Sequence, residues 1–201
     1  MTSDGKPMHD DLNWTLLESE PGPDLMIFSA RFDRLRNPRN GLEMRRVVLP
    51  SVDWINVVAI DDEDRSIMVR QFRFGSGDVT LETAGGMVDP GEKPIESARR
   101  ELLEETGYGG GQWQSLGSVA PNPAYHNNLC HHFLARGVAL LQPPEQGDGE
   151  AIEVIRMSEQ EIIAAARSGQ ISHVLALSAL CLLYTSPSPR DQRGSRMPSS
   201  A

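Results

Sequence analysis

The sequence predicts an α/β fold in which a mixed β-sheet is sandwiched between helices, with an N-terminal β-hairpin as an extension. Short segments of alternating or continuous apolar residues recur between turn-forming residues, as expected of strands. One amphipathic helical segment begins near Pro94 and separates two groups of these strands. Two more helical segments follow, after Ser158 and from residue 172. This order of elements is typical of a mixed α/β sandwich.

The chain has 201 residues, 39% hydrophobic and 23% charged, which suits one globular domain with a small additional element. Its net charge of -9 argues against a nucleic-acid-binding surface. Two cysteines, Cys130 and Cys181, are too few for a disulfide scaffold, so we expect a reducing, cytoplasmic location. The polar N-terminus differs from a signal peptide, and no run approaches the roughly 20 apolar residues of a membrane helix.

The N-terminal part is expected to be a disordered segment followed by a hairpin. Residues 1–12 are polar and acidic, which favours disorder. Residues 25–36 alternate loosely as a strand, and the turn formers at 37–41 lead to a returning strand at 43–49. We therefore assign residues 13–50 to an N-terminal hairpin extension.

The central part of the chain is rich in strand patterns. They cover residues 52–60, 66–74, 79–83, 112–119, 129–136 and 151–157. The first of them is apolar enough to be buried on both faces of a sheet. The acidic run at 61–64 is interpreted as a solvated turn between two strands rather than a metal site.

The helix after Pro94 carries three carboxylates on one face. Proline suits the first helical turn, and Gly107 is placed to end the helix. Glu101, Glu104 and Glu105 are spaced i, i+3 and i+4, so they lie side by side. They repel one another and stand near the negative end of the helix dipole. A solvated acidic face is one interpretation, and a bound Mg²⁺ or Mn²⁺ is the other, since these cations prefer oxygen ligands.

The C-terminal part predicts two helices and a tail. Ser158 and Glu161 form a capping-box pattern for a helix that ends at Gly169. A mostly apolar helix at 172–183 is expected to pack on the sheet. Residues 184–201 are rich in Ser, Pro and Arg without a hydrophobic period, so we interpret them as a non-native or disordered tail.

The order of residues around the acidic helix resembles the signature of the Nudix hydrolases. A glycine is followed, after fixed intervals, by a glutamate, an Arg-Glu pair, an apolar residue, a Glu-Glu pair and a second glycine with a final apolar residue. These positions are Gly86, Glu92, Arg100, Glu101, Leu102, Glu104, Glu105, Gly107 and Tyr108, of which Tyr108 is the loosest match. The resemblance implies a Nudix hydrolase domain over residues 51–183, acting on a nucleoside diphosphate linked to another moiety.

The resemblance also implies a metal site with Mg²⁺, or alternatively Mn²⁺, as the cofactor. Glu101 and Glu105 are the expected metal ligands, with Glu104 close behind. The backbone carbonyl of Gly85 is a further candidate ligand. Glu104 and Glu105 are at the same time expected to act in catalysis, because the metal they hold activates water and stabilises developing charge.

Two further roles follow from the resemblance. Arg100 cannot bind a metal, so we expect it to orient Glu92. The alternative role of Glu92 is to compensate the charge of the helix N-terminus. The general base is expected in a loop far along the chain, where Glu150 fits best and Asp148 and Glu153 are alternatives.

Residues outside the signature resemble ADP-ribose pyrophosphatases. The runs 69–75 and 81–86 are similar to those preceding the signature in these proteins, where Arg73 would face a substrate phosphate and Glu82 would also contact substrate. Thr83 stands where a proline is usual. Pro123 follows Tyr108 by 15 residues, as the family's characteristic proline does.

The predicted reaction is therefore metal-dependent hydrolysis of ADP-ribose to AMP and ribose 5-phosphate. Other NDP-sugars, NADH and dinucleoside polyphosphates are alternative substrates of the same class. A Nudix-fold module that senses a nucleotide without cleaving it is the alternative from another class. Related proteins are homodimers whose N-terminal strands cross to the partner, so we expect a homodimer that acts on small molecules, without nucleic-acid or membrane partners.

Overall fold

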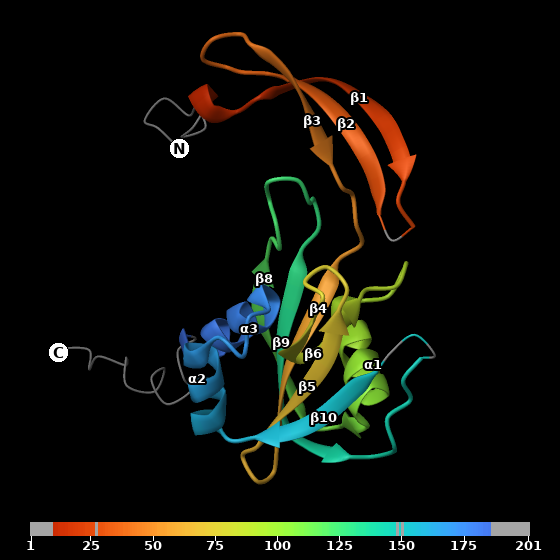
Figure 1. Ribbon diagram of the computed structural model, residues 1–201, viewed down its shortest axis with the longest axis vertical. Coiled ribbons are helices and arrows are strands. Elements are labelled where there is room, and N and C mark those ends of the chain that lie inside the picture. Colours follow the sequence, from red (N-terminus) through yellow and green to blue (C-terminus); the bar gives the residue numbers. More distant parts are fainter. Residues whose placement is uncertain (1–9, 27, 148, 150, 186–201) are drawn as a thin grey trace, which may run out of the picture. The chain divides into compact units, whose positions relative to one another are not determined.

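The computed structural model describes residues 10–26, 28–147, 149 and 151–185 (Figure 1). The chain divides into two compact units. One unit comprises Met1–Val52 with Ala120–Asn128, and the other comprises Asp53–Val119 with Leu129–Ala201. The expectations for residues 1–9 and for most of the tail, and the proposed base Glu150 with its alternative Asp148, lie outside the described residues.

The first unit contains a three-stranded antiparallel sheet rather than a two-stranded hairpin. The strands β2 (Ser29–Arg36) and β3 (Glu43–Val48) form the expected hairpin. The additional strand β1 (Thr15–Asp24) pairs with β2 at the edge of the sheet. Its Pro-Gly-Pro sequence is compatible with this place, since proline is tolerated at a sheet edge, where its missing N–H is not needed.

The start of this unit also differs from expectation. Asp10–Leu12 form a short 3₁₀ helix, η1, so the predicted disorder is wrong for these three residues. A homodimer built through the N-terminal strands stays a prediction.

The second unit is built on a seven-stranded mixed sheet of order β10-β5-β6-β4-β9-β7, with β8 paired to β9. Its strands are β4 (Trp54–Asp61), β5 (Ser66–Arg73), β6 (Asp78–Met87), β7 (Tyr108–Gly109), β8 (Gln112–Val119), β9 (Cys130–Leu140) and β10 (Ile152–Met157). The β4–β9 pair is parallel and the other pairs are antiparallel. As predicted, β4 is buried along nearly its whole length.

Two strands extend further than the sequence patterns indicated. β6 continues through Gly85 and Gly86 to Met87, because both glycines pair with β4. β9 continues to Leu140, where it pairs with Tyr108–Gly109 as the short strand β7. The segment just after the first helix is therefore part of the sheet.

Helices cover both faces of this sheet, as Figure 1 shows. On one face, α1 (Pro94–Thr106) packs its Ala98 and Leu102 into a core with residues of β4, β6 and β9. On the other face, α2 (Glu159–Ser168) and α3 (Val174–Thr185) enclose a second core. Because α3 ends at Thr185, the predicted start of the tail at residue 184 is two residues too early. No helix in the described part of the chain is long and apolar enough to span a membrane.

A buried histidine joins β9 to α3. His132 is fully buried, and its Nε2 lies 3.0 Å from Oγ of Ser178. Since Ser178 donates to the carbonyl of Leu175, its oxygen is left to accept the Nε2–H of a neutral imidazole. Nδ1 of His132 has no hydrogen-bond partner among the described residues. Burial, together with the neighbouring His131, lowers the pKa of His132 to about 4.

We expect the second unit to lose stability between about pH 6.5 and pH 4 because of His132. In that range His132 is protonated in the unfolded chain but stays neutral in the folded protein. The free energy of unfolding therefore falls by up to about 3 kcal/mol as the pH is lowered. Urea denaturation at several pH values, compared with His132→Gln, measures this effect. The variant keeps a donor for Ser178 but cannot titrate, so an equally steep loss of stability in both proteins would contradict the assignment.

Candidate active site

The acidic helix α1 is positioned by strong local signals. Pro94 occupies its first turn, and the side chain of Glu96 accepts a hydrogen bond from the N–H of Lys93 at 3.4 Å. Gly107 ends the helix with φ of 76°, a left-handed conformation that glycine adopts without a steric penalty. Ser97 donates to the carbonyl of Met87 at 3.0 Å, which fixes the helix against the end of β6.

The three carboxylates of α1 stand in three different environments. Glu105 is buried, with 4% of its surface exposed, and accepts a 3.1 Å hydrogen bond from the N–H of Gly85. The Glu101 side chain is 16% exposed and that of Glu104 is 44% exposed. The sequence pattern treated the three acids alike. In the structure their exposure to solvent increases from Glu105 to Glu101 to Glu104.

Two adjacent glycines of β6 allow this close packing. A Cβ on Gly86 would lie 2.2 to 2.6 Å from the atoms of the Glu101 carboxylate. A Cβ on Gly85 would lie 2.6 Å from the carbonyl oxygen of Ile55 and 2.7 Å from Nδ2 of Asn56. Gly86 therefore makes room for a carboxylate, and Gly85 makes room for the neighbouring strand.

Arg100 connects the other acids of the site. Its Nη1 lies 2.9 Å from Oε1 of Glu101 and 3.1 Å from Oε2 of Glu104. Its Nε and Nη2 face the two oxygens of Glu92 at 3.3 and 3.1 Å. The hydrogen bond from Arg100 holds the pKa of Glu92 below its ordinary value, and the same bond raises the pKa of the guanidinium. Arg100 thus orients three carboxylates, two more than the sequence suggested.

The donor set suits a hard cation in its chemistry, since it consists of carboxylate oxygens held close to a strand backbone. Glu92, Glu101 and Glu104 share a single guanidinium, and Glu105 lies on the same helix, which leaves negative charge for a cation to neutralise. Within the described ranges, no three acidic, histidine or cysteine side chains are already arranged as a metal site. The residues therefore fit a divalent cation in their chemistry.

A second polar cluster surrounds Arg73 at the end of β5. Its Nε and Nη2 bind both oxygens of Glu82 on β6, at 2.8 and 2.7 Å. The Glu82 side chain is fully buried, whereas the guanidinium of Arg73 that it binds is partly exposed. Such a two-point contact fixes the plane of an arginine.

Two residues that sequence reasoning missed complete this cluster. Thr80 donates a hydrogen bond to Glu82, and Nδ1 of His173 lies 3.2 Å from the same carboxylate. Burial alone would raise the pKa of Glu82, but the hydrogen bonds from Arg73 and Thr80 outweigh it and the pKa is lowered. Thr80 and Glu82 are two residues apart on one strand, so the sequence could have indicated that they share a face. His173 lies in the connection between α2 and α3, far from both in sequence.

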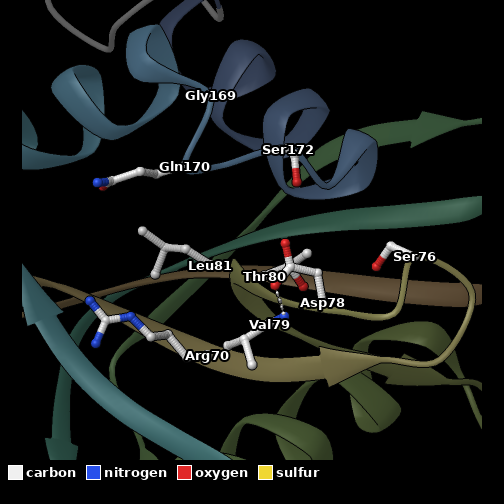
Figure 2. A pocket seen from close by; sticks show the side chains of 9 residues that line it. All are labelled: Arg70, Ser76, Asp78, Val79, Thr80, Leu81, Gly169, Gln170 and Ser172. Carbon is white, nitrogen blue, oxygen red and sulfur yellow. Dashed lines mark hydrogen bonds between the residues drawn. The ribbon is translucent and has the colours of Figure 1, made fainter.

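A pocket of about 430 Å³ lies beside this second cluster. Figure 2 shows Thr80, Asp78 and Leu81 beneath the connection between α2 and α3. Its lining residues are Arg70, Ser76, Asp78, Val79, Thr80, Leu81, Gly169, Gln170 and Ser172. None of them belongs to α1, so this pocket is separate from the carboxylates.

The remaining predicted site residues are Pro123, Glu153, Glu150 and Asp148. Pro123 belongs to the first unit. Glu153 lies on β10 and forms an exposed 2.9 Å ion pair with Arg70, which occupies its carboxylate. Glu150 and Asp148 lie outside the described residues.

Comparisons with known proteins agree with this architecture. The family profile of the NUDIX domain matches residues 52–176. The chain is 33% identical over 175 residues to the ADP-ribose pyrophosphatase of Mycobacterium tuberculosis, covering 82% of this chain and 83% of the relative. It is 30% identical over 128 residues to the GDP-mannose pyrophosphatase of Klebsiella pneumoniae subsp. pneumoniae, covering 60% and 64%.

A solved structure supports the fold. The crystal structure of an ADP compounds hydrolase superposes with a TM-score of 0.77 at 23% identity, covering 92% of this chain and 98% of that one. The family match spans more than half of the chain and contains the carboxylate helix described above. The chain belongs to the NUDIX family and is a Nudix hydrolase.

Proposed function

We propose that this protein hydrolyses the diphosphate of ADP-ribose, giving AMP and ribose 5-phosphate, with Mg²⁺ or Mn²⁺ as cofactor. The observation that carries the proposal is the packing of Glu105 against Gly85 and of Glu101 against Gly86, with Glu104 on the same helix. The name of the Mycobacterium tuberculosis relative supports the choice of substrate.

In this mechanism Glu101 and Glu105 would hold the cation, with Glu104 and the carbonyl of Gly85 as further ligands. The bound cation would lower the pKa of the attacking water and stabilise charge on the phosphate oxygens. Arg100 keeps Glu101 and Glu104 oriented and limits their mutual repulsion.

The reaction itself exchanges one phosphorus–oxygen bond for another. The water oxygen attacks one phosphorus, the bridging bond of the diphosphate breaks, and the water proton passes to a base, a role assigned to Glu150 from its place in the sequence. Arg73 binds a substrate phosphate, and Glu82 supports the guanidinium from the sheet. Pro123 is assigned to substrate contact on the resemblance alone.

GDP-mannose is the second candidate substrate, favoured by the name of the Klebsiella relative. A screen of ADP-ribose, GDP-mannose, NADH and diadenosine polyphosphates, with phosphatase-coupled detection of phosphate, separates the candidates. We expect the highest kcat/KM for ADP-ribose and no turnover after EDTA treatment. Turnover of GDP-mannose alone would select the second candidate, and activity that survives complete metal removal would contradict the proposed cofactor.

A further inference from the structure

The segment 141–146 runs back along the end of α1 and caps it. The last carbonyls of any helix lack partners within the helix. Here the N–H of Leu141 donates to the carbonyl of Gly107 at 2.9 Å, and the N–H of Glu145 donates to the carbonyl of Glu104 at 2.8 Å. The turn of α1 that carries two acids of the site is therefore held by a segment from beyond β9.

Gln146 continues this contact with its side chain. Its Nε2 donates to the carbonyl of Ile152 at 2.8 Å, and its Oε1 accepts from the N–H of Ile152 at 3.1 Å. The same Nε2 lies 3.5 Å from the carbonyl of Glu105, a longer contact. One amide thus pairs with the first residue of β10 as a neighbouring strand would, and reaches the end of α1 at the same time.

Ile152 is fixed from both sides by these contacts. On its other side it pairs with Gln71 of β5, within the main sheet. Gln146 consequently links the last turn of α1 to the sheet, since its Nε2 donates to the carbonyls of Glu105 and Ile152 while its Oε1 accepts from Ile152.

We propose that Gln146 is a positioning residue of the active site, which holds the turn bearing Glu104 and Glu105 at the distance from β10 that cation binding and turnover require. It touches neither the cation nor the substrate. The proposal rests on the proposed function. An amide is suited to this place because it donates and accepts at once, whereas a carboxylate only accepts.

The test compares Gln146→Ala and Gln146→Glu with the parent protein and with Gln142→Ala. Gln142 lies in the same segment, but its hydrogen bond in the described structure is made by its backbone N–H. We expect Gln146→Ala to lower kcat about 10-fold with little change in KM, because misplaced supporting groups typically cost 10- to 100-fold. Gln146→Glu keeps the hydrogen bond from the N–H of Ile152, so its kcat should fall between those of Gln146→Ala and the parent protein. Gln142→Ala should have the kcat of the parent.

A second readout does not depend on turnover. Mn²⁺ affinity of the protein without substrate, measured by titration calorimetry, should weaken about 10-fold in Gln146→Ala and remain unchanged in Gln142→Ala. A lower melting temperature with unchanged kcat and Mn²⁺ affinity would show that Gln146 is only structural. A parent protein that binds Mn²⁺ but cleaves no nucleoside diphosphate would refute the proposed function, while the Mn²⁺ comparison would still decide the role of Gln146.

Discussion

Replacing Glu105 with glutamine is expected to lower kcat by at least about 100-fold while the protein stays folded, which corresponds to about 3 kcal/mol of lost transition-state stabilisation. Glu105 is the most buried acid of α1, and its Oε2 accepts the N–H of Gly85 at 3.1 Å. The glutamine oxygen can accept the same bond, so the packing is kept. The negative charge is lost, and with it the attraction for a divalent cation.

The matched control for this variant is Glu96→Gln on the same helix. Glu96 is exposed and serves the helix start, where glutamine also fits the capping box. Steady-state kinetics with ADP-ribose should therefore leave the control near the parent value, and circular dichroism should be alike for all three proteins. Unchanged turnover in Glu105→Gln would remove Glu105 from the metal site.

The extent of α1 followed from the sequence because its signals are local. Pro94 and Gly107 act through their own backbone preferences, whatever the rest of the chain does. The strand β1 was missed for the opposite reason. Its pairing with β2 depends on a position at the edge of a sheet, which a proline-containing segment does not reveal by itself.

The candidate site was predicted in its composition but not in its arrangement. Spacing placed Glu101, Glu104 and Glu105 on one face, yet their different burial depends on how α1 meets β6. The hydrogen bond from the N–H of Gly85 to Glu105 was not predicted, and the role of the Gly85 carbonyl as a ligand stays a prediction. The support of Arg73 by Glu82 likewise depends on the pairing of β5 with β6, because their residues are far apart in a linear pattern.

Replacing Gly86 with alanine is expected to reduce kcat nearly as much as replacing Glu101 itself, by about 100-fold, with little loss of stability. The new Cβ would lie within 2.6 Å of the Glu101 carboxylate, and this carboxylate is the end of a flexible side chain that can turn away. The fold can therefore accept the methyl group, but the carboxylate cannot keep its place. Gly75→Ala is the control, since a Cβ there meets no atom within 4 Å.

A double variant tests whether the alanine acts through Glu101. If displacement of this carboxylate is the whole effect, Gly86→Ala combined with Glu101→Gln should be no slower than the slower single variant, because residues acting through one interaction are not additive. Independent effects would instead multiply to about 10,000-fold. A Gly86→Ala protein with full activity would mean that Glu101 does not need the position it occupies against β6, and the assignment of Glu101 as a metal ligand would fail with it.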